Sequence, residues 1–261
     1  MQEIEQSDIA TWPDEYESIL EFYFWEPQHL NRFSPAPDRR LGLDAVLARL
    51  RKREVPLNHL FSIFFSLVPS AMAARLLTAV APGIEGGSAY LINSPAFRRS
   101  KLRGICQPDL LLIVDDRPVF WELKIDSTTS EEQLLKYALL GELVTQKSEK
   151  APALVLVGRT AAFPAADTFE NLRATELLHI STKFERHASD FGVTRAALRA
   201  AARRIALFRT SYTAIHGHLA SELKRVDAES ESGQTLSKLL HGMVVTLENI
   251  QPRHRRPVTR K

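Results

Sequence analysis

The distribution of apolar residues predicts helices in the N-terminal part of the chain. Around residues 44–53, apolar side chains recur at intervals of three and four, which is typical of one face of a helix. The stretch Leu57–Ala74 carries no formal charge, but serines and Pro69 interrupt it, and it is shorter than the roughly 20 apolar residues that cross a bilayer. We therefore expect a buried helix over 60–68 that stops near Pro69, and a further helix to about Val80.

The centre of the chain has a strand-like pattern. Ala89–Ile92 is a short apolar run, and two β-rich segments follow, Asp109–Val114 and Val119–Ile125. The four residues between these segments, Asp115–Pro118, have the composition of a turn. The pattern therefore predicts a β-hairpin.

A helix and a buried strand are expected after the hairpin. Ser130 is a suitable N-cap, and Gln133 stands three positions further on, as in a capping box. The helix would cover about residues 133–143. Ala153–Val157 is a continuous apolar run of the kind found in the middle of a sheet. The order strand, strand, strand, helix, strand predicts an α/β core built on a mixed sheet.

The remainder of the chain, from about Thr168, has a helical composition. The alanine- and arginine-rich segment 194–209 predicts a helix that continues to about Val226. Residues 227–233 have the composition of a linker, and 235–247 predict a last amphipathic helix.

These patterns divide the chain into four parts. We expect an N-terminal helical region over 1–84, an α/β core over 85–167, a C-terminal helical region over 168–251 and a tail over 252–261. The sequence contains no internal repeat or low-complexity tract. The two helical regions are expected as additions to one core.

Composition agrees with an ordinary soluble globular protein. The chain has 261 residues, of which 44% are hydrophobic and 25% charged. Cys106 is the single cysteine, so an internal disulfide and a structural zinc or iron–sulfur site are excluded. The acidic N-terminus lacks the apolar region of a signal peptide. We expect a cytoplasmic protein that does not span a membrane.

The basic character of the chain is concentrated in its tail. The last ten residues contribute +5 to the net charge of +3, so the rest of the chain carries −2. Arg253, Arg255 and Arg256 of this tail are candidate nucleic-acid contacts, because cationic side chains bind phosphate backbones through counterion release. A solvated tail without a partner explains the same residues equally well.

The predicted hairpin carries the residues with the most specific chemistry. Alternate residues of a strand share a face, so Glu122 and Lys124 are expected on one side with Phe120. Trp121 and Leu123 would pack on the other side.

Asp109 would lie beside Glu122 if the two strands pair in register across the turn. Two carboxylates and one ammonium, that of Lys124, would then converge at one end of the sheet. Carboxylate oxygens are the ligands that Mg²⁺ prefers. A bound metal neutralises a phosphate and lowers the pKa of a water molecule, and a lysine can orient that water. The set therefore indicates phosphodiester hydrolysis.

At these residues the chain resembles the PD-(D/E)XK nuclease superfamily, which includes restriction endonucleases and RecB-type nuclease domains. The matching residues are Pro108-Asp109 and, thirteen positions after Asp109, Glu122-Leu123-Lys124. Gln133 and Tyr137 resemble the QxxxY element of the RecB-like branch. The resemblance covers residues 88–159, about a quarter of the chain. It implies a restriction endonuclease-like core with a central four-stranded mixed sheet flanked by helices.

The resemblance also implies a role for each matching residue. Asp109 and Glu122 would bind Mg²⁺ or Mn²⁺ together with the Leu123 carbonyl, and Lys124 would orient or activate the attacking water. The reaction would be metal-dependent cleavage of DNA.

In the same family, the glutamine and tyrosine at the positions of Gln133 and Tyr137 face the active site and contact the DNA. Many members add an acidic residue from an upstream helix. Here Glu85 is the nearest candidate, with Glu54 and Asp44 as more distant ones.

Further basic residues are candidate nucleic-acid contacts. One group lies between the first two predicted strands, and a second repeats every four residues along a predicted helix. Rows of this kind are more often solvated than functional. The two groups are Arg98, Arg99, Lys101 and Arg103, and Arg195, Arg199 and Arg203.

Other interpretations of the same residues stay open. Glu122 and Lys124 could form an ordinary ion pair on a strand, Gln133 could only cap its helix, and Tyr137 could only fill the core. The whole chain could be a non-catalytic nucleic-acid-binding or assembly protein that keeps the fold, or a helical scaffold that docks a partner. A nuclease of this type could act as a homodimer or within a larger defence or repair complex. The sequence does not choose between DNA and RNA, between strand forms, or between endo- and exonuclease action.

Overall fold

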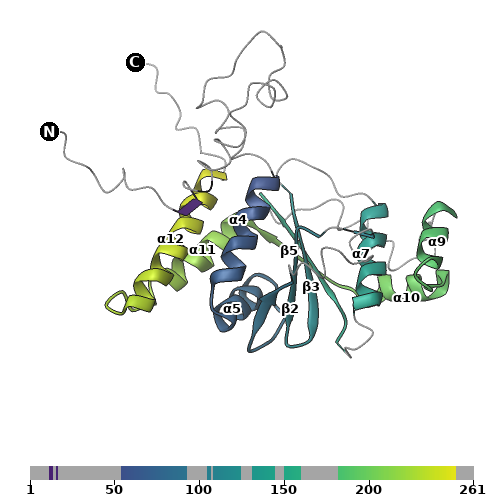
Figure 1. Ribbon diagram of the computed structural model, residues 1–261, viewed down its shortest axis with the longest axis horizontal. Coiled ribbons are helices and arrows are strands. Elements are labelled where there is room, and N and C mark those ends of the chain that lie inside the picture. Colours follow the sequence, from purple (N-terminus) through teal and green to yellow (C-terminus); the bar gives the residue numbers. More distant parts are fainter. Residues whose placement is uncertain are drawn as a thin grey trace, which may run out of the picture. The chain divides into compact units, whose positions relative to one another are not determined.

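The computed structural model describes the greater part of the chain. The described residues are Trp12, Pro13, Tyr16, 54–92, 105, 106, 108–124, 131–144, 150–159 and 182–250. They belong to two compact units. One unit is Phe65–Ile215, and the other combines Met1–Phe64 with His216–Lys261. Figure 1 shows both.

A five-stranded mixed sheet forms the centre of the unit Phe65–Ile215. Its strands lie side by side in the order of the chain, with β1 antiparallel to β2, β2 antiparallel to β3, and β4 and β5 parallel to β3. The strands are β1 (Ala89–Leu91), β2 (Leu110–Val114), β3 (Arg117–Leu123), β4 (Ala153–Gly158) and β5 (Ala206–Ser211). An α/β fold with a mixed sheet is therefore confirmed.

The expected number of four strands is wrong, because β5 comes from a segment that we expected to be helical. The helix α10 (Arg195–Arg204) has Ile205 as its C-cap, β5 follows at once, and α11 (Tyr212–Leu223) begins directly after it. β5 pairs with β4 along its full length. The alanine-rich residues form α10, whereas β5 contains Phe208, Thr210 and Ser211, which are weak helix formers and pair with β4 instead.

The β2–β3 hairpin is confirmed, with a tighter turn than expected. Asp115 and Asp116 alone connect the strands, and Arg117 and Pro118 already belong to β3. Both turn residues have positive φ, 41° and 68°, as a two-residue turn of type I′ requires. This turn matches the right-handed twist of the paired strands.

The Asp115 carboxylate connects the hairpin to the segment before β1. It accepts hydrogen bonds from the backbone of Gly87 (2.7 Å) and Ser88 (3.1 Å) and from the Ser88 hydroxyl (3.0 Å). These hydrogen bonds, the Gly87 bond foremost, lower the pKa of Asp115 below its ordinary value. A close approach of Gly86 belongs to the same contact, since a Cβ there would come within 2.4 Å of Val114.

Helices cover both faces of the sheet. The helix α7 (Glu131–Val144) connects β3 to β4 and lies on one side, whereas α5 (Ser70–Val80) lies on the other (Figure 1). The helix α4 (Glu54–Leu67) ends just before Pro69, as expected. On the α7 side, α10 packs against α7, and α9 (Thr182–Ser189) packs against α10.

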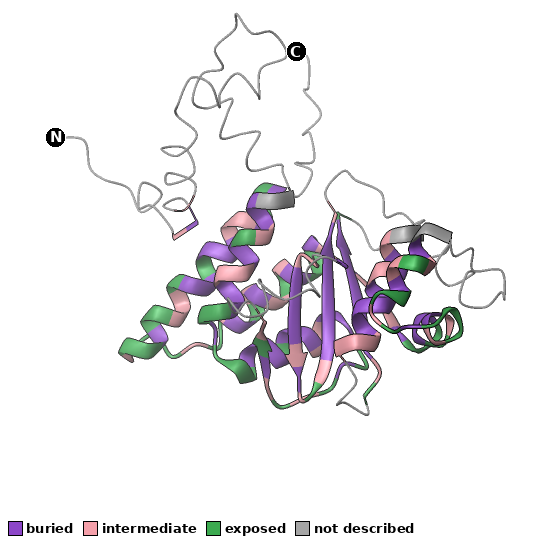
Figure 2. Ribbon diagram, turned by 45° about the vertical axis from the view of Figure 1, so that its right-hand side comes forward, coloured by how far each residue is buried: buried purple, intermediate pink, exposed green. Residues whose placement is uncertain are grey.

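The two faces of β3 bury different aromatic residues. Trp121 is fully buried and makes an edge contact with Phe65, with ring centroids 5.4 Å apart. Phe120 points to the opposite face and packs against Tyr137 of α7, at 5.6 Å. The expected division of β3 into a Phe120 face and a Trp121 face is confirmed. Figure 2 shows the sheet as the most buried part of the unit.

The second unit is helical in its described part. The helix α12 (Glu231–Ile250) starts four residues earlier and ends three residues later than the 235–247 that we expected. The Trp12 indole donates a hydrogen bond to the Leu239 carbonyl at 3.0 Å, so an N-terminal residue docks on this C-terminal helix. Among the described residues, no helix is long and apolar enough to cross a membrane.

We expect Asp116→Gly to stabilise the protein by about 0.5–1 kcal/mol. Asp116 has a φ of 68°, a backbone conformation that costs energy for any residue with a Cβ, although the more flexible unfolded chain offsets part of the gain. Urea unfolding measures the difference. Asp115→Gly is the matched control, and it should destabilise, because it removes the acceptor for Gly87 and Ser88. Equal effects of the two substitutions would contradict this account of the turn.

Candidate active site

Glu122 is a buried carboxylate near the end of β3. Only 4% of its surface is exposed. Its neighbours on the strand, Trp121 and Leu123, are fully buried on the opposite face. A charged carboxylate at such a position is costly unless hydrogen-bond donors or a cation replace the water that it loses.

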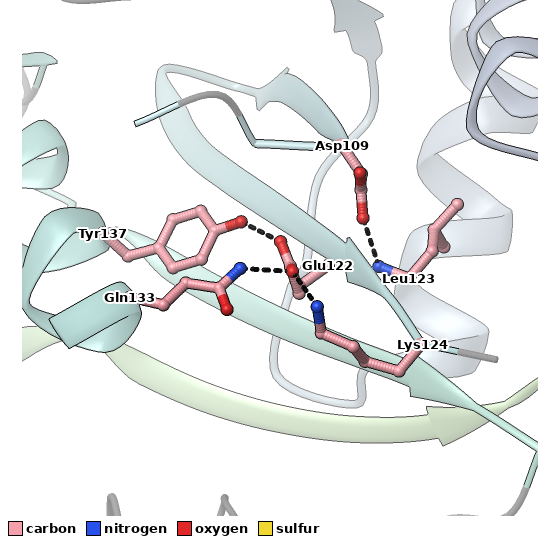
Figure 3. A network of polar contacts seen from close by, with 6 residues as sticks. All are labelled: Asp109, Glu122, Leu123, Lys124, Gln133 and Tyr137. Atoms are coloured by element: carbon pink, nitrogen blue, oxygen red, sulfur yellow. Dashed lines mark hydrogen bonds and ion pairs between the residues drawn. The ribbon is translucent and has the colours of Figure 1, made fainter. Parts of the chain in front are cut away.

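Three side chains donate to the Glu122 carboxylate, as Figure 3 shows. The Lys124 ammonium lies 2.5 Å from Oε1, and the Gln133 amide donates to the same oxygen. The Tyr137 hydroxyl donates to Oε2. Gln133 and Tyr137 are four residues apart on α7, so they share the helix face that looks onto β3.

Two titratable groups near Glu122, the Tyr137 phenol and the Cys106 thiol, are neutral. Burial, followed by the charge of Glu122, raises the pKa of Tyr137 well above its ordinary value, so the phenol keeps its proton and donates it. The same two causes raise the pKa of the Cys106 thiol to about 12. Lys124 is therefore the cation among these contacts that balances the Glu122 charge.

Asp109 stands across the hairpin from Glu122. The register that pairs Leu110 with Trp121 brings Asp109 opposite Glu122. The Asp109 carboxylate accepts a hydrogen bond from the Leu123 backbone N–H at 2.7 Å (Figure 3). The carboxylate thus replaces the backbone acceptor that a longer β2 would offer to this N–H.

The Leu123 carbonyl lies on the same edge of β3 as its N–H. Continuing the hairpin register places Pro108 opposite Leu123. Proline has no N–H, so residue 108 cannot donate the ladder hydrogen bond that this carbonyl would otherwise receive. A carboxylate and a backbone carbonyl are therefore presented side by side where the ladder stops.

The structure brings six of the sequence-predicted residues together. They come from the end of β2, the end of β3 and the first two turns of α7. Glu122 contacts its three donors directly, and Asp109 contacts Leu123, the residue after Glu122. The six residues are Asp109, Glu122, Leu123, Lys124, Gln133 and Tyr137.

Glu85 is not part of this group. It lies just before the Gly87–Ser88 segment that binds Asp115, at the hairpin-turn end of the sheet. Glu122 lies at the opposite end, since β3 rises about 17 Å between Arg117 and Glu122. The candidate Glu85 is therefore not placed beside Glu122. Asp44 and the side chain of Glu54 lie outside the described residues.

The helical arginines lie on α10. Arg195 and Arg203 are exposed, and Arg195 pairs with Glu185 at 3.4 Å. Arg199 is half-buried. The end of α10 is fixed to the far end of α7 by an Arg204–Glu142 ion pair of 2.6 Å.

The other predicted basic contacts cannot be placed. Arg98, Arg99, Lys101, Arg103, Arg253, Arg255 and Arg256 lie outside the described residues.

Arg209 is a basic residue that sequence analysis missed. It lies on β5, in the row that pairs Glu122 with Leu156 and Leu156 with Arg209. Assigning this segment to a helix concealed its position. Residues 207–213 contain two aromatic residues, two threonines and a serine, all weak helix formers, and this composition could have indicated the strand.

The donor set fits a hard divalent cation in its chemistry. It consists of two carboxylates, Asp109 and Glu122, with the Leu123 carbonyl beside them, and such ions prefer oxygen ligands. Two carboxylates and the single Lys124 ammonium leave one negative charge uncompensated within this set. Among the described residues, no group of three or more acidic, histidine or cysteine side chains converges.

Comparison of the chain with protein-family models, with curated proteins and with solved structures gave no match.

We expect Tyr137→Phe to destabilise the protein by about 1–3 kcal/mol. The substitution keeps the ring in the core but leaves the buried Glu122 carboxylate without one of its donors. Urea unfolding at neutral pH measures the loss. Tyr90→Phe is the matched control, because Tyr90 is 50% exposed on β1 and its hydroxyl loss should cost nothing measurable. A Tyr137→Phe protein as stable as this control would show that the hydroxyl does not support Glu122.

We expect Cys106 to react with a thiol reagent at pH 8 roughly 10²–10³-fold more slowly in the folded than in the urea-unfolded protein. The folded pKa of about 12 leaves very little thiolate at this pH. Glu122→Gln should accelerate labelling of the folded protein, because its charge is the second cause of the raised pKa.

The raised pKa of the Cys106 thiol also makes the free energy of unfolding depend on pH. The stability that the neutral thiol contributes is fully present below the ordinary thiol pKa and is lost as the pH rises towards 12. Fast labelling of the folded wild type, or no effect of Glu122→Gln, would contradict this description of the site.

Proposed function

We propose that this chain is a metal-dependent nuclease that hydrolyses phosphodiester bonds of DNA, with a site of the PD-(D/E)XK type. The observation that supports this proposal most is the position of Glu122. It is a buried carboxylate with a lysine two residues further on the same strand, and Asp109 faces it across the hairpin. Apolar residues could take the place of these buried charged residues at little cost in stability, so stability alone does not account for them.

Asp109 and Glu122, with the Leu123 carbonyl, are the groups that would hold a divalent cation. When bound, Mg²⁺ or Mn²⁺ would neutralise phosphate charge and lower the pKa of a water molecule. Tyr137 and Gln133 are neutral donors, so they orient the Glu122 carboxylate without cancelling its charge. In this proposal, the two α7 residues position Glu122, in addition to facing the substrate.

Lys124 is the residue that acts on the reacting groups. Its ammonium lies 2.5 Å from Glu122 Oε1 and is 12% exposed, at the end of β3. From this position it can orient the attacking water and donate to a phosphate oxygen as negative charge develops there. Since the Glu122 charge attracts the ammonium, the lysine is held at the reacting phosphate and away from solvent.

The proposed function also includes the finer classification of the fold. The strand order, the hairpin carrying Asp109 and Glu122, and the α7 crossover to a parallel β4 support a restriction endonuclease-like core. In this proposal β5 is a fifth strand added beside β4. A homodimer would supply the second site that double-strand cleavage requires.

The test is a cleavage assay with linear, circular and single-stranded DNA in the presence of Mg²⁺, Mn²⁺ or EDTA. We expect cleavage by the wild type that requires metal, and a loss of at least about 100-fold in rate for Lys124→Ala. Lys150→Ala is the matched control. Lys150 is an exposed lysine that donates to the Asp115 carbonyl at the turn end of the hairpin, so its loss should leave the rate unchanged.

The outcomes separate the two functions that we considered. Cleavage by the wild type and Lys150→Ala but not by Lys124→Ala supports the nuclease. DNA binding without cleavage under any condition would instead support a non-catalytic nucleic-acid-binding protein. A specific observation favours that second candidate, because both oxygens of Glu122 are already engaged by its own chain.

A further inference from the structure

The face of the sheet that α7 covers carries charged strand residues at two positions, and both lie in one row. Paired residues share a face, so the strand pairings assign every described strand residue to one face or the other. On the Glu122 face, the charged strand residues among those described are Glu122 and Arg209. The residues of this face are Tyr90, Leu111, Ile113, Pro118, Phe120, Glu122, Leu154, Leu156, Gly158, Leu207, Arg209 and Ser211.

Packing confirms that Arg209 belongs to this face. Leu207, two residues earlier on β5, packs against the core cluster that contains Leu156 and Tyr137. Phe208, between Leu207 and Arg209, lies on the opposite face, where the Arg117 guanidinium stands over its ring at 6.0 Å. Arg209 therefore projects to the same side as Glu122.

The row fixes the separation of the two charged residues. Glu122 pairs with Leu156, and Leu156 pairs with Arg209, so their Cα atoms are two strand spacings apart, about 10 Å. All three strands run parallel, so both residues lie near the carboxyl ends of their strands. Lys124 lies just beyond the same end of β3. A long, half-buried arginine at this distance can reach a group held over the buried Leu156.

The guanidinium of Arg209 is suited to binding an anion. The guanidinium is always charged and presents a planar fork of donors that matches phosphate oxygens. A nucleic-acid strand that places one phosphate at Glu122 has further phosphates on both sides of it. Its sugar–phosphate backbone would therefore bring an anion to the β5 side of the site.

We propose that Arg209 binds a phosphate group of the nucleic-acid strand that is engaged at Glu122 and Lys124. This inference rests on the proposed nuclease function and adds β5 to the substrate-binding surface. Arg209 holds the strand across the ends of β3, β4 and β5, whereas Lys124 acts at the reacting phosphate. The α10 arginines are not required for this contact.

The test is the salt dependence of DNA binding, measured by fluorescence anisotropy with a labelled duplex in EDTA, where metal-dependent cleavage is suppressed. Removing one phosphate contact reduces the slope of log Kd against log salt concentration by about 0.9. We expect this reduction for Arg209→Gln, with binding about 5- to 30-fold weaker at low salt. Arg209→Lys should retain the slope, because it keeps the charge.

Two further variants make the result specific. Arg75→Gln removes the same charge from an exposed position on α5, on the other side of the sheet, and should leave the slope at the wild-type value. If Arg209→Gln does not fold, Arg209→Met replaces it as the test variant, because it keeps an apolar side chain of similar length beside Leu156 and Leu207; its slope should be reduced by the same amount.

The failure of this inference can be told from the failure of the proposed function. If the wild type binds and cleaves DNA but Arg209→Gln, or the folded Arg209→Met, has the slope of Arg75→Gln, Arg209 contacts no phosphate and the nuclease proposal stands. If the wild type neither binds nor cleaves nucleic acid, both proposals are overturned. A reduced slope in the Arg209 variants alone supports the contact.

Discussion

The need to solvate one buried carboxylate organises the candidate site. Glu122 is nearly inaccessible to water, and an ionised group in such a position costs several kcal/mol unless the protein replaces its hydration. The replacement comes from two elements. Lys124 belongs to the same strand, whereas Gln133 and Tyr137 come from the helix that follows it. The position of α7 against β3 is therefore tied to the charge of one residue, and any movement of the helix would leave that charge without two of its three donors.

The register of the hairpin is the second constraint. A shift of one residue between β2 and β3 would turn Glu122 to the face occupied by Trp121 and Phe65 and would bury it there without donors. The two-residue turn prevents this shift, because its positive φ values suit a single pairing of the strands. The Asp115 carboxylate adds a connection to the segment before β1. Chemistry at one end of the sheet thus depends on turn geometry at the other.

Much of the candidate site could be predicted from the sequence, because its spacings are local. Residues two apart on a strand share a face, which relates Glu122 to Lys124, and residues four apart on a helix share a face, which relates Gln133 to Tyr137. A short turn between two strands relates Asp109 to Glu122. These relations hold in any fold that keeps the strands and the helix. The donor contacts of Gln133 and Tyr137 with Glu122 do not follow from them, because they depend on how closely α7 packs on the sheet.

The sequence by itself determined the elements whose patterns are periodic: the hairpin, α7, the buried β4 and the helix break before Pro69. The composition of residues 207–213 is compatible with a strand, but tertiary structure alone decided that residues 206–211 pair with β4. It alone placed Arg209 in the row of Glu122 and Glu85 at the opposite end of the sheet. The physical reason is common to these cases. Local periodicity states which face a residue occupies, whereas strand pairing over long sequence separations states which residues share a row.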